Sequence, residues 1–456
     1  MEQLPDHAVL RMLQFLDVTS LLTCRLVCRR LGDLVLNADA WRHRTVCVTT
    51  CACPELRLAP CLQLLDIKSD KLSESSCLPA ALVWTRCAVA KLHLRVAPAG
   101  DLMAGVATAA ILRQAGLGRL RSLVVHVRAG LSDSVHAMLL AAVASARGLE
   151  EVEVDVTDVV PGLMAISLGS TAVTPSLKRF ECVLAEGTEP FVNFILAGHA
   201  DTLETVRLYG APFSAVATST APILARMAQL RQLTCYVTML GLEAVAACKA
   251  LRVLKLCLSS CTREDRAACA GAVEVLRRAE NLRELNLSGN AATARVFVEL
   301  FQALALNTRS RLESLKIRLP YRHNRNGPSL RALISALPSL AALQHLHLRY
   351  VTDTCAKQVV DDLMLAITPT TAPALRRVQL EPPALCVHGW LHGDAFQTAM
   401  ARNPLLHFTL DCFIAYCRDT ACKACTQGCH AVLLGMEEES DDSDCMEESY
   451  TGNASV

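Results

Sequence analysis

Apolar residues recur along most of the chain in one short pattern, and its clearest copy reads Leu282-Arg-Glu-Leu285-Asn-Leu287. Leu285 and Leu287 are two positions apart, so on a β-strand their side chains point to the same side of the sheet. Leu282 joins them from the preceding turn, and polar residues fill the positions between. The pattern predicts a short strand whose apolar face needs neighbouring strands of the same kind to bury it.

This apolar-x-x-apolar-x-apolar pattern occurs thirteen times, at intervals of 21 to 32 residues. The copies begin at Leu62, Val89, Leu120, Leu149, Leu177, Leu203, Leu230, Leu251, Leu282, Leu312, Leu343, Leu375 and Leu405. Between them, residues 264–278 and 293–306 place Ala, Val and Leu on one helical face. A strand and a helix repeated at this period are typical of a solenoid. We predict an α/β fold: an array of about 13 β-α repeats, residues 45–412, bent into a horseshoe with strands inside and helices outside.

A different pattern occupies residues 1–44. Leu4-Pro5-Asp6 opens an apolar run at helical spacing, and Ser20 stands where it can cap a second helix. That second helix would carry Leu21, Leu22, Leu26 and Val27. We predict three short helices. Because about forty residues build only a small core, these helices either share their burial with a partner or cap the array.

The repeated pattern resembles the consensus of leucine-rich repeats, and residues 4 to about 44 resemble an F-box. The F-box motifs occur in the order of that family: Leu4-Pro5, Leu10, Leu13, Phe15-Leu16, Leu21-Leu22, Val27-Cys28-Arg29-Arg30 and Trp41. Ser20 and Leu31 depart from the commonest form, which has Asp and Trp at those places. The combination resembles a class of substrate receptors of ubiquitin ligases.

The resemblance implies a non-catalytic substrate-recognition subunit of an SKP–cullin–F-box E3 ubiquitin-protein ligase. In that family the F-box binds the SKP adaptor, and through it the cullin scaffold. The residues that would carry or support this contact are Leu4, Pro5, Leu10, Leu13, Leu16, Leu21 and Leu22. The alternative is an intracellular leucine-rich-repeat scaffold that binds proteins without a ligase role, in which the N-terminal helices only cap the array.

Residues between the buried strand positions should face the concave side of the array. The middle of this face is acidic, with Glu151, Glu153 and Asp155, and its far end is basic. Candidate substrate-binding residues at the basic end are Lys316, Arg318, Tyr321, Arg322, His347 and Arg349. Because Arg pairs bidentately with carboxylates and phosphates, we predict that this end receives an acidic or phosphorylated segment of a protein substrate. The alternative is an ordinary solvated surface.

Composition narrows the choice of function. Apolar residues make up 52% of the chain but aromatic residues only 4%, which suits stacked aliphatic repeats better than a catalytic cleft. The sequence has 22 Cys and no secretory signal pattern, so we expect a reducing location, cytoplasmic or nuclear, with most cysteines buried. No apolar run reaches membrane-spanning length, so we expect no membrane contact. The net charge of +1 argues neither for nor against nucleic acid, and we expect no nucleic-acid partner.

The C-terminal residues carry two further features. Residues 413–436 are rich in Cys, and Cys422 and Cys425 have a metal-ligand spacing; we expect reduced thiols in a cap or linker, with a zinc site as the alternative. Residues 437–456 form an acidic segment that predicts a disordered tail, and one hypothesis is that it folds back onto the basic end. The sequence contains no catalytic or nucleotide-binding motif, so we predict a non-enzymatic chain without metal or cofactor.

Overall fold

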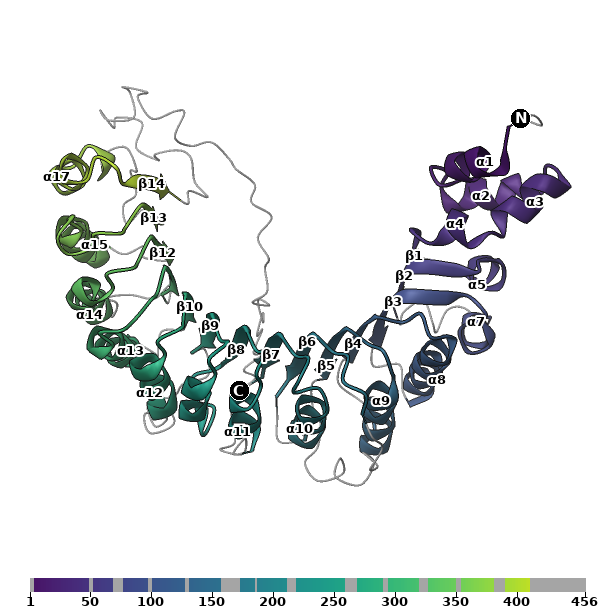
Figure 1. The fold of residues 1–456 in the computed structure, drawn as a ribbon, viewed down its shortest axis with the longest axis horizontal. Helices are drawn as coiled ribbons and strands as arrows, with labels where there is room; N and C mark the ends of the chain where they lie inside the picture. Colours follow the sequence, from purple (N-terminus) through teal and green to yellow (C-terminus); the bar gives the residue numbers. More distant parts are fainter. Residues whose placement is uncertain are drawn as a thin grey trace, which may run out of the picture.

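The computed structural model describes residues 4–48, 52–68, 77–96, 101–127, 131–156, 173–184, 187–210, 219–258, 269–289, 294–319, 327–349, 354–380 and 390–410. Fourteen strands form one sheet, and they follow one another in sequence order from β1 to β14. Neighbouring strands are parallel throughout. Figure 1 shows the sheet curving into an arc, with strands lining the inner side and helices covering the outer side. The predicted α/β horseshoe is therefore confirmed.

The strands are β1 Thr45–Val48, β2 Cys61–Lys68, β3 Ala88–Val96, β4 Ser122–Val127, β5 Glu151–Val156, β6 Arg179–Val183, β7 Thr205–Tyr209, β8 Gln232–Tyr236, β9 Val253–Cys257, β10 Glu284–Ser288, β11 Ser314–Arg318, β12 His345–Arg349, β13 Arg377–Leu380 and β14 His407–Leu410. The outer helices are α5 Cys53–Leu58, α7 Leu78–Trp84, α8 Asp101–Leu117, α9 Asp133–Ser145, α10 Glu189–Gly198, α11 Thr220–Ala225, η2 Leu242–Ala247, α12 Ala270–Arg278, α13 Ala294–Leu306, α14 Gly327–Ala336, η4 Leu337–Ser339, α15 Thr354–Ala366 and α17 Asp394–Arg402.

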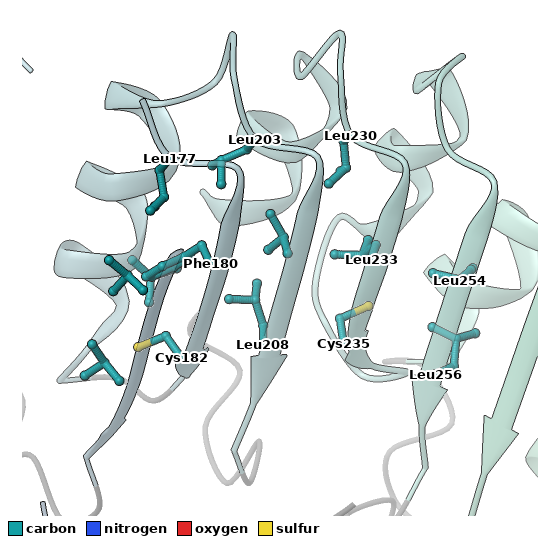
Figure 2. Packing of buried hydrophobic residues seen from close by; sticks show 14 of the residues in the cluster. Leu177, Phe180, Cys182, Leu203, Leu208, Leu230, Leu233, Cys235, Leu254 and Leu256 are labelled. Carbon is teal, nitrogen blue, oxygen red and sulfur yellow. The ribbon is translucent and has the colours of Figure 1, made fainter. Parts of the chain in front are cut away.

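The register of the strands stacks equivalent apolar residues into rows. Leu285 pairs with Leu254 on one side and with Leu315 on the other. The whole row is inaccessible to solvent. Figure 2 shows such rows in the middle of the array, where the labelled side chains project from the strands toward the helices. Full burial of an aliphatic side chain of this size contributes about 1.5–3 kcal/mol, so the rows are the main source of cohesion between repeats.

The outer helices supply the second half of this core. In α13 the buried residues include Phe297, Leu300, Phe301 and Leu304, which recur at the spacing of one helical face. The rings of Phe297 and Phe301 stack with their centroids 5.9 Å apart. Both helical segments predicted from apolar spacing, residues 264–278 and 293–306, thus contain observed helices.

Buried polar side chains tie successive repeats together at the ends of the helices. The Asn307 amide donates to the carbonyl oxygens of Leu276 and Ala279, one repeat earlier, at 2.9 and 3.2 Å. Gln114 accepts from the backbone N–H of Val89 and donates to a neighbouring carbonyl oxygen in the same way. These contacts satisfy backbone groups that would otherwise be buried without a partner, a loss that costs about 1–3 kcal/mol each.

The last repeat departs from the prediction. Leu405 occupies the pattern position that is buried in the other twelve repeats, but its side chain is 71% exposed. Its neighbour Leu406 is buried instead. Phe408 and Leu410 of β14 are only partly buried, and among the described residues no strand follows β14 in the sheet. The terminal repeat therefore buries its apolar residues less completely than an internal one.

Most cysteines in the described residues are buried, as expected from the sequence. The buried ones are Cys53, Cys61, Cys87, Cys182, Cys235, Cys248, Cys257 and Cys269, whereas Cys28, Cys47 and Cys77 are exposed. None of the helices in the described part of the chain is long and apolar enough to cross a membrane.

Candidate protein-binding surfaces

A small helical domain precedes the array and forms one end of the arc in Figure 1. Its helices are α1 Asp6–Leu13, α2 Val18–Cys24, α3 Arg29–Val35 and α4 Ala38–Trp41, where three helices were predicted. They close around a core whose fully buried members include Leu21, Val35 and Trp41. The indole N–H of Trp41 donates to the carbonyl oxygen of Val35 at 2.5 Å, which gives this large buried side chain its polar partner.

The start and end of α2 differ from the prediction. Asp17, not Ser20, caps the helix, because its carboxylate accepts from both the backbone N–H and the hydroxyl of Ser20, at 2.7 and 2.9 Å. These hydrogen bonds to Ser20 lower the pKa of Asp17. The helix ends at Cys24, so Leu26 and Val27 lie in the turn that follows it, and both are exposed. Two apolar residues predicted to be helical thus lie in an exposed turn.

Arg44 fixes the end of α1 against the junction with the array. Its guanidinium donates to the carbonyl oxygens of Leu13, at 2.5 Å, and of Leu16. The Nε atom donates to Ala40 at 2.9 Å. Desolvation by burial lowers the pKa of Arg44. The partly buried Arg44 side chain therefore helps to hold the segment that carries Phe15 in place.

Arg30 holds the N-terminal segment of the helical domain. It pairs with the carboxylate of Asp6 at 2.6 Å and also donates to the carbonyl oxygen of Leu4. Because Arg30 lies at the start of α3, these contacts tie the N-terminal Leu4-Pro5-Asp6 segment to that helix.

The exposed large apolar side chains of the helical domain are its candidate binding residues, and together we call them the N-terminal apolar surface. They are Leu4, Met12, Phe15, Leu26, Val27 and Leu36. Phe15 is 85% exposed and Leu26 is 81% exposed, although both are large and apolar. A domain this small exposes such residues when a partner is to cover them.

The predicted adaptor-binding residues divide into three groups. Leu4 and Pro5 are exposed; Leu10, Leu16 and Leu22 are partly buried; Leu13 and Leu21 are buried. Leu13 and Leu21 therefore can only support a contact from within the core. The sequence-based selection of adaptor-binding residues did not include Met12, Phe15, Leu26 and Val27. The feature that could have identified them is an apolar residue just inside or just beyond the end of a helix.

The helical domain is continuous with the array. Strand β1 begins at Thr45 and pairs with β2 from Thr45 to Val48, so the chain enters the sheet directly after α4. Helix α4 packs against β2, and Arg119 donates to the carbonyl oxygen of Arg42 at 3.2 Å. The orientation of the N-terminal apolar surface is thereby fixed relative to the arc.

The second candidate surface lies on the concave face of β11 and β12, and we call it the basic end. Lys316 lies opposite His347, and Arg318 lies opposite Arg349, in the register of these two strands. Neighbouring strands are about 4.8 Å apart, so the four side chains predicted from separate repeats form one group. Glu284 of β10 reaches into this group and pairs with Lys316 at 3.3 Å.

The middle of the concave face is acidic but partly neutralised. His126 of β4 and Glu153 of β5 meet at 2.7 Å, and this hydrogen bond raises the pKa of His126. Arg207 pairs with Glu181 at 3.5 Å in a largely buried contact. His93 has a lowered pKa because burial disfavours its charged form. The middle of the concave face thus carries both acidic and basic side chains, whereas β11 and β12 carry Lys316, Arg318 and Arg349.

Four features inferred from the sequence lie outside the described residues. These are Tyr321, Arg322, the Cys-rich residues 413–436 and the acidic residues 437–456. Within the described residues, no three His, Cys, Asp or Glu side chains are grouped so as to hold a metal ion.

Comparisons with known proteins identify the N-terminal part of the chain. Residues 1–47 match the family model described as F-box-like, so the helical domain is an F-box-like domain. No curated protein matches the chain. Among solved structures, a chain in the crystal structure of the Rad7 and Elc1 complex in yeast is similar at 15% sequence identity and a TM-score of 0.36, over 77% of this chain and 80% of that one.

Proposed function

We propose that this protein is the substrate-recognition subunit of an SKP–cullin–F-box E3 ubiquitin-protein ligase. The observation that carries the proposal is the N-terminal apolar surface. An F-box-like domain of about forty residues leaves Phe15 and Leu26 almost fully exposed, and Arg44 and Arg30 hold the segments that carry Phe15 and Leu4 in place. Ordered, exposed apolar residues on a fixed scaffold are suited to docking on a preformed partner groove, here that of the SKP adaptor.

The array would act as the receptor for the substrate. We place the substrate at the basic end, where Lys316, Arg318, His347 and Arg349 lie on two adjacent strands. Guanidinium groups in this arrangement favour carboxylate or phosphate partners, which supports an acidic or phosphorylated protein segment. The contribution of this chain to ubiquitin transfer would be to hold a substrate near the charged ubiquitin enzyme, a proximity effect without chemistry of its own.

The proposed division of the chain follows from these roles. Residues 1–44 would bind the adaptor, residues 45–412 would bind the substrate, residues 413–436 would end the array, and residues 437–456 would form an acidic tail. The adaptor links the chain to the cullin scaffold in this scheme, and the working place would be the cytoplasm, the nucleus or both.

Co-purification with the SKP adaptor tests the proposal. The variant Phe15→Asp/Leu26→Asp places charge in the N-terminal apolar surface, and Trp84→Asp provides a matched control, because Trp84 is 80% exposed on α7 of the array. We expect the wild type and the Trp84 variant to retain the adaptor and the double variant to lose it. Failure of the folded wild type to bind the adaptor would favour the alternative, a repeat scaffold whose N-terminal helices only cap it.

A second comparison tests the place of the substrate. Charge reversal by Arg318→Glu/Arg349→Glu should abolish capture of acidic or phosphorylated peptides while adaptor binding remains. The matched control is Arg95→Glu, because Arg95 also lies on the concave face but on β3, eight strands away from β11. If the control weakens capture as much as the double variant, the contact is a general charge effect and the basic end is not the site.

A further inference from the structure

Two cysteine side chains from successive repeats meet near the F-box-like end of the array. Cys53 is the first residue of α5, and Cys77 immediately precedes α7. Their Sγ atoms are 2.9 Å apart. Cys53 is buried and Cys77 is exposed. The two residues are 24 positions apart in the sequence, so the fold and not the local chain brings the sulfurs together.

We propose that Cys53 and Cys77 are an oxidation site that forms a reversible intramolecular disulfide. The sulfurs need to approach by roughly 0.9 Å to reach the covalent S–S length of about 2.05 Å. Helices α5 and α7 already pack against each other, so side-chain rotation and a small shift of the helix ends suffice. The bond would link α5 and α7, which are neighbouring outer helices among the described residues.

The chemistry balances with a peroxide as the oxidant. The Cys77 thiolate attacks one peroxide oxygen, the O–O bond breaks, and water and a sulfenic acid form. The Cys53 thiol then attacks the Cys77 sulfur, the S–O bond breaks, and a second water leaves as the disulfide forms. The two thiols lose two protons and two electrons in total, and the peroxide takes them up. A small thiol such as glutathione reverses the step by thiol–disulfide exchange.

The position of the pair gives each cysteine a different role. Cys77 is exposed, so it can meet the oxidant, whereas burial shields Cys53 until the sulfenic acid forms beside it. Cys87 and Cys235 are poor reactants by comparison, because burial raises the pKa of each thiol to about 12. A thiol reacts as its thiolate, so oxidation should select the exposed member of the close pair.

The consequence would be a covalent link beside the F-box-like domain. Strand β2 lies between the two cysteines in the chain and pairs with β1, the strand that joins the domain to the array. A disulfide across this unit reduces the freedom of the unfolded chain. The oxidised protein should therefore resist local opening of the first two repeats more than the reduced protein does.

Peptide mapping of the full-length protein provides the test. The reduced protein is treated with equimolar hydrogen peroxide, remaining thiols are blocked with N-ethylmaleimide, and the protein is digested with trypsin. Cleavage after Arg44, Arg57, Lys71 and Arg86 separates peptide 45–57, which holds three cysteines, from peptide 72–86, which holds only Cys77. We expect the two peptides to appear joined, lighter than their sum by two hydrogen atoms, and to separate after reduction.

Single variants assign the bond and can overturn the proposal. Cys47→Ser should leave the joined peptide in place, because Cys47 shares peptide 45–57 but lies on β1, whereas the Sγ atom of Cys77 lies against that of Cys53. Cys77→Ser, at an exposed position, and Cys53→Ser should each abolish it. The proposal is wrong if the joined peptide persists in Cys53→Ser, or if peroxide yields only sulfinic or sulfonic acid at Cys77 in the wild type.

Discussion

Truncation of Phe15 to Ala separates binding from folding in the F-box-like domain. The Phe15 side chain is 85% exposed and contributes little to the core, so Phe15→Ala should change the free energy of unfolding by no more than about 0.5 kcal/mol. If the adaptor covers this ring, complex formation buries most of a side chain whose full burial is worth about 1.5–3 kcal/mol. The expected loss of binding free energy is about 1–2.5 kcal/mol, or roughly a 5- to 60-fold rise in Kd.

Leu13→Ala is the matched comparison. Leu13 is the last residue of α1, two positions before Phe15, and is 4% exposed, so its truncation should cost about 2–5 kcal/mol of folding free energy through the cavity it leaves. Titration calorimetry with purified SKP adaptor, together with thermal melting of each variant, measures both quantities. We expect Phe15→Ala to weaken binding at unchanged Tm, and Leu13→Ala to lower Tm. Unchanged affinity for Phe15→Ala would refute the assignment of Phe15 to the contact surface.

Three further predictions concern the fold and its electrostatics. Leu282→Ala should cost about 2–5 kcal/mol of local stability, because Leu282 is buried. Leu405→Ala, at the equivalent pattern position, should cost about 0.5 kcal/mol or less, because Leu405 is exposed. Hydrogen exchange of both variants checks this difference. Arg44→Ala should destabilise the helical domain by about 1–3 kcal/mol, because it leaves carbonyl groups without a donor. Arg44→Lys should restore this stability only in part, and the hydrogen-exchange protection of α1 measures both effects. The raised pKa of His126 should appear in an NMR titration as a midpoint above 6.5, and this midpoint should fall in Glu153→Gln. Because the folded-state pKa is raised, the His126–Glu153 pair stabilises the protein fully below pH 6.5, and this contribution is lost as the pH rises through the folded-state pKa.

The strands could be predicted because their signal is local and repeated. Each strand shows two apolar residues at a spacing of two, and both enter the core wherever another repeat follows. The prediction for Leu405 was wrong for a physical reason. The pattern records which residues are apolar, but burial also needs neighbouring strands, and β14 is the last strand in the part of the chain that the structure describes. A pattern confined to one segment does not contain that information.

The buried polar side chains were harder to foresee. Asn307 and Gln114 lie at or near helix ends, where an amide in the sequence is equally compatible with a solvated cap. Their partners belong to the preceding repeat, so the interaction depends on the stacking of repeats. The same holds for the Cys53–Cys77 contact, which no spacing within one repeat reveals.

The candidate surfaces were predicted to different extents. The basic end needed only the alternation of strand side chains and the order of the repeats, and its four described members do lie together. The N-terminal apolar surface needed the tertiary packing of four short helices. Leu13 and Phe15 are both apolar and two residues apart, yet one is buried and the other exposed, because α1 ends at Leu13 and the chain changes direction there.

Continuity of the sheet links the two surfaces in one mechanical unit. Strand β1 follows the F-box-like domain directly and is hydrogen-bonded to β2, and each later strand is paired with its predecessor as far as β12. Ten strand steps separate β1 from β11, so at about 4.8 Å per step the hydrogen-bonded path is roughly 50 Å long. A receptor that works by proximity depends on a defined separation between docking site and substrate. A curved sheet supplies that separation through paired strands, without relying on a flexible linker between the two surfaces.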